Sequence, residues 1–154
     1  MIMGLSGHFL RDRVSLGVMK MRENELQFFS NPRLVAPDGR RVEPYRGPVA
    51  ILTDAISLSA AEIFAGGMQS IGRARIFGQT SGGQALPAAW SRLPNGDILY
   101  HAMADFTTPD GTRLEGRGVI PDELVPLSRQ NLLAGRDQPL EAAIQWIEQQ
   151  RSQH

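Results

Sequence analysis

The most constraining feature of this sequence is an apolar run, PVAILT at residues 48–53, that leads directly into a helical pattern. A run without polar alternation is typical of a strand buried on both faces of a parallel sheet. The helical pattern places apolar residues on one stripe, at Ile63, Phe64, Gly67, Met68 and Ile71. A second strand-like run, RARIFG, follows at residues 73–78. Strand, helix and strand within about 30 residues predict a βαβ unit with parallel strands and a right-handed crossover.

The segment before this unit is expected to add a helix and antiparallel strands. Residues 2–10 have the composition of a short helix, and residues 13–31 form two alternating stretches around the polar sequence RENE, which predicts a hairpin. Residues 32–48 are rich in proline, glycine and arginine. They predict a loop with a turn at residues 37–39.

The segment after the unit changes from glycine-rich to β-rich and ends in a helix. A glycine-rich stretch at residues 79–90 precedes a β-rich stretch with turn signals at residues 95–96 and 110–111. Residues 117–127 are extended and interrupted by prolines, and residues 139–151 predict a final helix. The apolar residues of that helix recur at helical spacing: Leu140, Ala143, Ile144 and Ile147.

Length and charge limit the class of protein. A chain of 154 residues with 42% hydrophobic residues has room for one domain with a core of its own. We expect a single α/β domain with a leading part at 1–46, a core at 47–127 and a C-terminal helix within 128–154. Sixteen basic residues balance sixteen acidic ones, so no overall field would recruit nucleic acid or an anionic membrane.

Several kinds of site and segment are excluded by what the sequence lacks. There is no cysteine, which rules out disulfides, thiolate metal sites and a cysteine nucleophile. The TSGG sequence has no lysine of a phosphate-binding loop, and the histidines lack metal-ligand spacing, so no metal or other cofactor is expected. No apolar run approaches the roughly 20 residues of a membrane helix. The first residues do not have the order of a signal peptide, because their charges follow the apolar part.

Ser59 allows two interpretations. The sequence Ser59-Ala60-Ala61-Glu62 matches a capping box, in which serine and glutamate satisfy backbone N–H groups at a helix start. A residue at the carboxyl end of a buried parallel strand also lies where α/β proteins bind ligands. There it sits beside free N–H groups and the positive end of the helix dipole, which suits an oxyanion. The residues alone leave both a helix cap and a nucleophile open.

Two long stretches resemble the C-terminal processing peptidases, the family of the tail-specific proteases and of the tricorn core. They are GPVAILTDAISLSAAEIFAGGMQSIGRARIFGQTSGGQALP and LPNGDILYHAMADFTTPDGTRLEGRGVIPD, which together run from about Gly47 to Asp122. The resemblance implies that Ser59 is the nucleophile and that the Ala60 amide is one oxyanion donor. It also implies a ClpP/crotonase-like βαβ spiral with a small added β-sheet, incomplete at its N-terminal side.

The departures from the family pattern concern the general base. The lysine that many members place 25 residues after the serine is Gln84 here, and Lys20, the single lysine, lies in the early hairpin and matches no motif. An aspartate found in some members 11 residues after the serine is Ser70. Tricorn-like members use a histidine base with an assisting glutamate, for which Glu115 is the match. The glycine-rich oxyanion loop of the family is also absent, so we expect the carboxyl-terminal part of a longer catalytic domain.

The three histidines are weak candidates for that base. His8 follows the first helix and is expected at its edge, and His154 is the terminal residue. His101 lies in a strand on the face of Leu99 and Met103, where a histidine is usually structural. It stays a minor candidate, beside a base supplied from outside this sequence.

The resemblance therefore predicts a serine endopeptidase that acts on polypeptides, without cofactor, and that self-associates as a homo-oligomer. Two alternatives remain: an inactive peptidase-like binding or scaffold domain, which the change to Gln84 fits, and a crotonase-type acyl-CoA enzyme. The family suggests a periplasmic or other extracytoplasmic location for the parent protein. This chain carries no targeting signal, and its compartment stays open.

Overall fold

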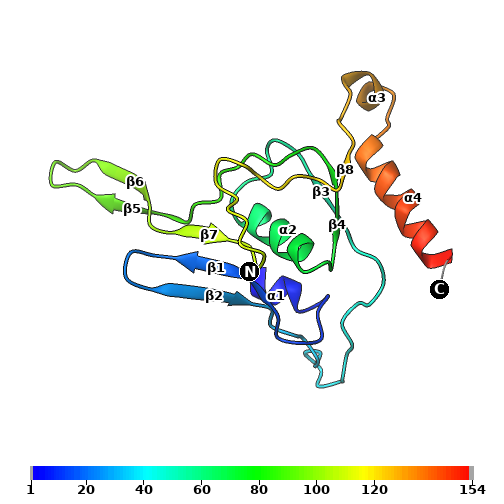
Figure 1. The fold of residues 1–154 in the computed structure, drawn as a ribbon, viewed down its shortest axis with the longest axis horizontal. Helices are drawn as coiled ribbons and strands as arrows, with labels where there is room; N and C mark the ends of the chain where they lie inside the picture. The colour runs from blue at the N-terminus through cyan, green and yellow to red at the C-terminus, as the bar shows by residue number, and fades with distance from the viewer. Residues whose placement is uncertain (1, 153–154) are drawn as a thin grey trace.

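The computed structural model describes residues 2–152 and has a mixed α/β fold built around a short parallel sheet. Strands β3 (Ala50–Thr53) and β4 (Arg75–Gly78) pair in parallel, and helix α2 (Ala60–Ser70) connects them (Figure 1). Strand β8 (Glu123–Leu124) adds to the other side of β4, which gives the order β3-β4-β8. The predicted βαβ unit is confirmed.

A second sheet packs against the opposite side of α2. It is antiparallel and has the order β2-β1-β7, from strands β1 (Ser15–Lys20), β2 (Glu25–Phe29) and β7 (Asp105–Thr107). The predicted hairpin is thus present as β1 and β2. Helix α2 approaches β1 closely because Gly67 has no side chain: a Cβ there would lie 2.7 Å from the carbonyl oxygen of Leu16.

The buried side of α2 is the stripe that the sequence predicts. Ile63 and Met68 are buried, and Phe64 and Ile71 pack against the same core. Helix α1 (Ile2–Ser6) packs against α2 as well. The core therefore lies between the two sheets, around α2, and it fixes where this helix begins.

Helix α4 (Gln138–Ser152) covers the outer face of the parallel sheet, and its predicted apolar stripe is partly wrong (Figure 1). Ala143 is buried, but Leu140 and Ile144 are 44% and 47% exposed. The helix is turned so that Trp146 packs on Phe77, with ring centroids 5.6 Å apart. The contact between these two large aromatic rings decides which face of α4 is buried, and the smaller side chains of Leu140 and Ile144 stay partly exposed.

Strand β3 is not buried on both faces as predicted, because it lies at the edge of its sheet. Leu52 is 42% exposed, while Ile51, on the opposite face, packs against the core. An apolar run thus occurs here in an edge strand, and Leu52 stays partly exposed although α4 packs against the same sheet.

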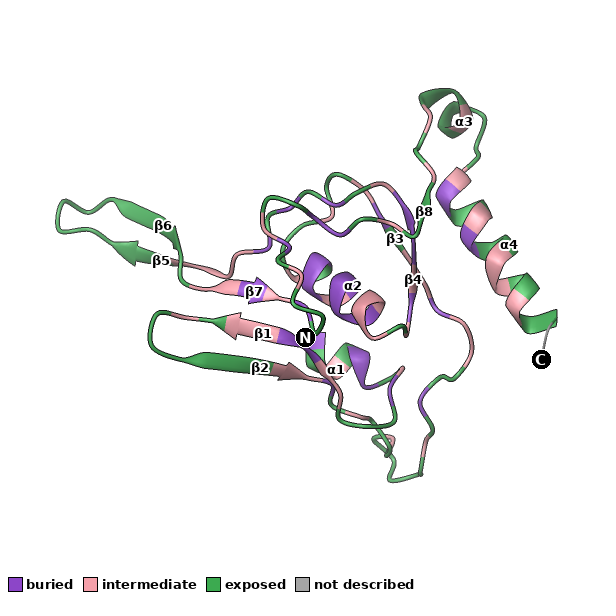
Figure 2. Ribbon diagram, viewed as in Figure 1, coloured by how far each residue is buried: buried purple, intermediate pink, exposed green. Residues whose placement is uncertain are grey.

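The β5–β6 hairpin extends away from the body of the molecule. Strands β5 (Ala88–Arg92) and β6 (Ile98–Ala102) are joined by a turn that contains the predicted Asn95-Gly96 pair, and every residue of β6 is exposed (Figure 2). A short helix, α3 (Arg129–Leu133), precedes α4. None of the described helices is long and apolar enough to span a bilayer.

Candidate active site

Ser59 occupies a sharp turn between β3 and α2, directly before the first helical residue. Its φ is 56° and its ψ is −120°, and it is the only non-glycine residue with positive φ in the described part of the chain. These angles are those of the first corner of a type II′ turn, a position that favours glycine. A non-glycine residue held in such a region costs about 1–3 kcal/mol, so the surrounding contacts must hold Ser59 in place.

Two acceptors hold the backbone N–H of Ser59. One is the carbonyl oxygen of Gln84, at 3.0 Å, and the other is Oε2 of Glu62, also at 3.0 Å. Gln84 belongs to the glycine-rich segment, whereas Glu62 lies in the first turn of α2. The strained turn is therefore fixed to the helix and to the loop at once.

The Glu62 carboxylate is the centre of this arrangement. It is fully buried and accepts three further hydrogen bonds, from Ser81 Oγ at 2.6 Å, from Gly83 N–H at 2.7 Å and from Gln84 N–H at 2.9 Å. Burial of a carboxylate is costly unless its oxygens find donors. Four donors, Ser59 N–H included, satisfy both oxygens of Glu62.

Ser81 extends the network to a third segment of the chain. Its hydroxyl donates to Glu62 and accepts the N–H of Val119 at 2.6 Å. Two buried polar side chains, Glu62 and Ser81, thus link three segments: the start of α2, the glycine-rich loop and the segment that leads into β8.

The turn at Ser59 keeps features of both roles considered for this residue. Both halves of a capping box are present, with the Ser59 side chain facing the backbone of Glu62, but no hydrogen bond of normal geometry joins the Ser59 hydroxyl to the helix. The hydrogen bond of normal geometry runs from the Ser59 N–H to the Glu62 carboxylate. The Ser59 hydroxyl is therefore only weakly held at the helix start.

Gln84 lies next to Ser59, and Lys20 does not. The backbone contact between Ser59 N–H and Gln84 O brings these two residues together, and the Gln84 side chain is exposed. Lys20 ends strand β1 of the other sheet, where it pairs with Glu25 and Asp105. The residue beside the serine therefore carries an amide, which cannot take up a proton as a base does.

Glu115 supports the same loop from its far end. Its Oε2 accepts the N–H groups of Ala85 at 2.7 Å and Leu86 at 3.0 Å. Glu62 and Glu115 thus hold successive backbone amides of residues 83–86. In this structure Glu115 contacts the loop that carries Gln84 and not Ser59 itself.

The structure does not bring His101 to Ser59. Its Nε2 lies 3.1 Å from Ser91 Oγ, across the exposed β5–β6 hairpin, and its Nδ1 lies 3.3 Å from the carbonyl oxygen of Ala102. His8 follows α1, where its carbonyl oxygen accepts the N–H of Tyr45. The third histidine, His154, lies outside the described residues.

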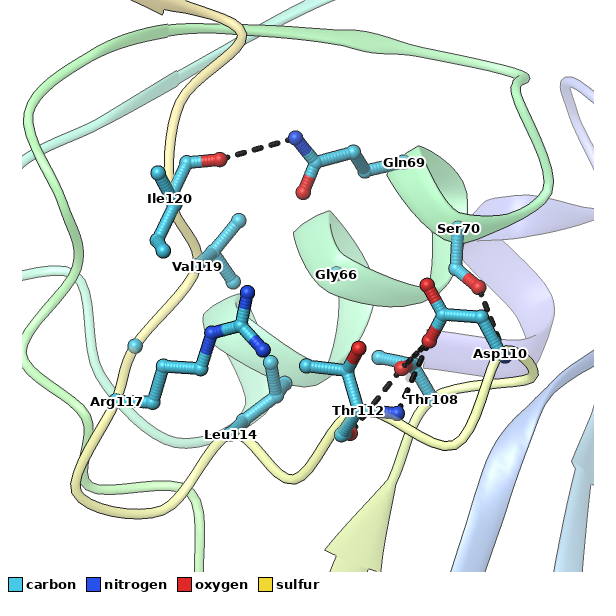
Figure 3. A pocket seen from close by; sticks show the side chains of 11 residues that line it. Gly66, Gln69, Ser70, Thr108, Asp110, Thr112, Leu114, Arg117, Val119 and Ile120 are labelled. Atoms are coloured by element: carbon cyan, nitrogen blue, oxygen red, sulfur yellow. Dashed lines mark hydrogen bonds between the residues drawn. The ribbon is translucent and has the colours of Figure 1, made fainter.

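A polar hollow of about 310 Å³ lies at the opposite end of α2 (Figure 3). Ser70, which the resemblance matches to an aspartate of some family members, lies here, and its hydroxyl accepts the N–H of Asp110. Ser70 lies eleven positions after Ser59 along the helix, which corresponds to about 16 Å. Ser70 is therefore remote from the nucleophile, and the hollow is distinct from the Ser59 turn.

Asp110 has an altered pKa in this hollow. The Thr108 hydroxyl, and after it the Thr112 N–H, donate to its carboxylate and lower the pKa of Asp110 below its ordinary value of 3.8. These bonds close the turn at residues 108–112 (Figure 3). Across residues 2–152, no three His, Asp or Glu side chains come together as a metal site would need.

The sequence did not reveal the central position of Glu62 or the contribution of Ser81. Glu62 matched a capping box, which accounts for one of its four hydrogen bonds. A signal was present: Glu62 adjoins Ile63 on the buried side of the helix, and a buried carboxylate requires several donors. The neighbouring glycine-rich loop offers such donors as backbone N–H groups.

A strained serine on a sharp strand-to-helix turn is the geometry of a serine-nucleophile site. The sequence model of peptidase family S41 matches residues 3–125, most of this chain, and the chain belongs to that family. A relative, the carboxyl-terminal-processing protease of Picosynechococcus sp., is 34% identical over 79 residues. That match covers 51% of this chain and 19% of the relative.

Two solved structures share the fold. A putative peptidase from Parabacteroides merdae superposes with a TM-score of 0.73 at 24% identity, over 93% of this chain and 45% of its own. The tricorn protease superposes with a TM-score of 0.64 at 22% identity, over 94% of this chain and 13% of its own. This chain therefore spans less than half the length of each of these relatives.

Proposed function

We propose that this chain carries the nucleophile of a serine endopeptidase and that Ser59 is that nucleophile. The observation that carries the proposal is the strained backbone of Ser59, at a positive φ and held in place by Glu62 and Gln84. Strain of this kind gathers at functional sites, where the surrounding contacts maintain it. Membership of family S41 supports the same assignment.

In the proposed reaction, Ser59 Oγ attacks the carbonyl carbon of a peptide bond. The hydroxyl proton passes to a base, and the carbonyl oxygen becomes an oxyanion. Ala60 is the first residue of α2 and has no acceptor within the helix for its N–H, so this group is free to donate to the oxyanion. The positive end of the helix dipole stabilises the same charge. Collapse of the intermediate breaks the peptide bond: the base gives its proton to the departing amine, and the acyl group stays on Ser59 until water hydrolyses the ester and restores the hydroxyl.

The base is the part of the machinery that Gln84 cannot supply. Gln84 takes the position of the family's lysine beside Ser59, but an amide does not accept a proton at useful pH. We place the base on another segment of the catalytic domain, of which this chain is the carboxyl-terminal part. Glu115 then assists by holding the loop beside Ser59, and His101 is disfavoured by its contact with Ser91.

The remaining features of the proposal concern the whole protein. Its substrate is a polypeptide, and it self-associates as a homo-oligomer. Its complete catalytic domain has the ClpP/crotonase-like spiral, of which the βαβ unit described above is one repeat.

An inactive binding or scaffold domain is the second candidate, and Gln84 is the observation that favours it. An assay of casein cleavage, an unfolded polypeptide substrate, distinguishes the active peptidase from the inactive domain. The assay uses the full-length protein. Endopeptidase activity should fall by at least about a hundredfold in Ser59→Ala and remain in Ser57→Ala, a matched serine in the same turn. No cleavage by the folded wild-type protein, or equal cleavage by both variants, would remove Ser59 from the reaction.

A further inference from the structure

Ser81 is a buried serine in the glycine-rich loop, and three hydrogen bonds fix the direction of its hydroxyl. Its backbone N–H donates to the carbonyl oxygen of Val119 at 3.1 Å, and its Oγ accepts the N–H of the same residue at 2.6 Å. The hydroxyl proton is directed at Glu62 Oε1, which lies 2.6 Å away. Because Ser81 is only 6% exposed, water does not compete for these contacts.

The segment that holds Ser81 lies close against it, because Gly118 has no side chain. A Cβ at Gly118 would collide with the carbonyl oxygen of Ser81 and lie 3.0 Å from its Oγ. Gly118 also has a φ of 74°, in the left-handed region that favours glycine. The backbone of this segment therefore confines the Ser81 side chain and keeps its hydroxyl directed toward Glu62.

The carboxylate of Glu62 needs donors on both oxygens to stay in one orientation, because the last torsion of a glutamate side chain is broad. Oε1 accepts the Ser81 hydroxyl and the Gly83 N–H. Oε2 accepts the N–H groups of Ser59 and Gln84. Ser81 is the one side chain among these four donors. Without it, Oε1 would keep a single donor, and the carboxylate would be free to turn Oε2 away from the Ser59 N–H.

We propose that Ser81 is a positioning residue for the nucleophile and that it acts through Glu62 on the Ser59 turn. The inference rests on the proposed function, since it concerns the rate at which Ser59 reacts. The backbone of Ser59 is strained, so it depends on the contacts that hold it. A reacting group displaced by about 1 Å loses about a hundredfold in rate. Ser81 touches no reacting atom, so its loss should slow acylation and leave substrate binding unchanged.

Ser30 provides a matched control for a substitution at Ser81. It directly follows β2 and is 2% exposed. Its Oγ donates to the carbonyl oxygen of Asp12 at 2.7 Å and accepts the N–H of Val14 at 2.9 Å. Like Ser81, Ser30 therefore gives one hydrogen bond and accepts another in a buried place. Ser30→Ala removes such a pair of bonds without touching the contacts that hold Ser59.

The rate of fluorophosphonate labelling at Ser59, measured on the full-length protein, tests the inference. In Ser81→Ala the second-order rate constant should fall by at least about tenfold, and in Ser30→Ala it should stay within about twofold of wild type. Ser81→Thr keeps a hydroxyl and should retain more of the rate than Ser81→Ala. With a peptide substrate, Ser81→Ala should lower kcat and change KM by less than about twofold. An unchanged labelling rate in Ser81→Ala, or an equal loss in Ser30→Ala, would overturn the inference.

Amide hydrogen exchange reports on the Ser59 turn without relying on its chemistry. Ser81→Ala should raise the exchange rates of the Ser59 and Gln84 amides, which both donate to Glu62 Oε2, by at least about tenfold. Ser30→Ala should leave these two rates unchanged. A wild-type protein that takes up no label would overturn the proposed function. A wild type that is labelled, together with unchanged exchange at Ser59 in Ser81→Ala, would overturn the role of Ser81 alone.

Discussion

At the scale of single residues, the backbone conformation of Ser59 is the strongest sign of a functional site. Its positive φ would suit glycine, yet the chain places a serine there. A residue retained at such a cost is a sign of function more than of stability. The Glu62 carboxylate accepts the Ser59 N–H and so ties this turn to the first turn of α2.

The strain at Ser59 predicts an inverted order of stability for two substitutions. In a helix interior alanine is more stable than glycine, because glycine loses more conformational freedom on folding. Ser59 is the N-cap of α2, where glycine is already preferred to alanine, and its positive φ adds to that preference. Ser59→Gly should therefore be more stable than Ser59→Ala by at least about 1 kcal/mol. Urea unfolding of both variants measures the difference. Equal stability, or a more stable alanine variant, would show that Ser59 does not hold this conformation.

Substitution of Glu62 should lower the free energy of unfolding far more than substitution of an exposed glutamate. In Glu62→Gln, an amide NH₂ group replaces one oxygen and faces N–H or O–H donors that have no other acceptor. Each donor left without a partner costs about 1–3 kcal/mol, so the free energy of unfolding should fall by at least that amount. Glu148→Gln, at an exposed site on α4, should change it by less than about 0.5 kcal/mol. Similar values for the two variants would contradict the network.

Asp110 predicts a dependence of stability on acid pH. Its folded pKa is lowered, chiefly by the Thr108 hydroxyl, so its contribution to stability is present above the unfolded pKa and is lost as pH falls through the folded value. Carboxyl titration by NMR should give Asp110 a pKa below 3.8. In Thr108→Val the pKa should move back up, because that donor is removed. An unchanged pKa in the variant would exclude the hydroxyl as its cause.

At the scale of secondary structure, periodicity identified the elements but not the neighbours that decide their burial. The stripe on α2 was predicted correctly, because both of its sides meet a sheet. On α4 the same reasoning favoured Leu140 and Ile144, and the contact between Trp146 and Phe77 turned the helix away from them. Periodicity gives the width of an apolar face, whereas the partner element selects its centre.

The orientation of α4 predicts a contrast between two substitutions one half-turn apart. Trp146→Ala removes the contact with Phe77 and should lower the free energy of unfolding by about 2 kcal/mol, less than for a fully buried tryptophan. Ile144→Ala, on the exposed side, should change it by less than about 0.5 kcal/mol. Thermal unfolding followed by circular dichroism compares them. A larger effect at Ile144 would restore the stripe that the sequence predicted.

At the scale of the whole molecule, local patterns and the family resemblance predicted the βαβ unit, the early hairpin and the position of Ser59 at a strand-to-helix turn. The Glu62 network could not be predicted, because its donors come from segments about 20 residues away, at Ser81, Gly83 and Gln84. Nor could the exposure of Leu52, since an apolar run does not tell whether a strand is central or at an edge.

The central claim is that Ser59 is an activated nucleophile, and labelling with a fluorophosphonate probe tests it most directly. The labelled residue is located by peptide mass spectrometry in the wild-type protein, in Ser59→Ala and in Ser57→Ala. The account predicts label on Ser59 in the wild type and in Ser57→Ala, and none in Ser59→Ala. Absence of label from the folded wild-type protein, or label that persists in Ser59→Ala, would contradict it.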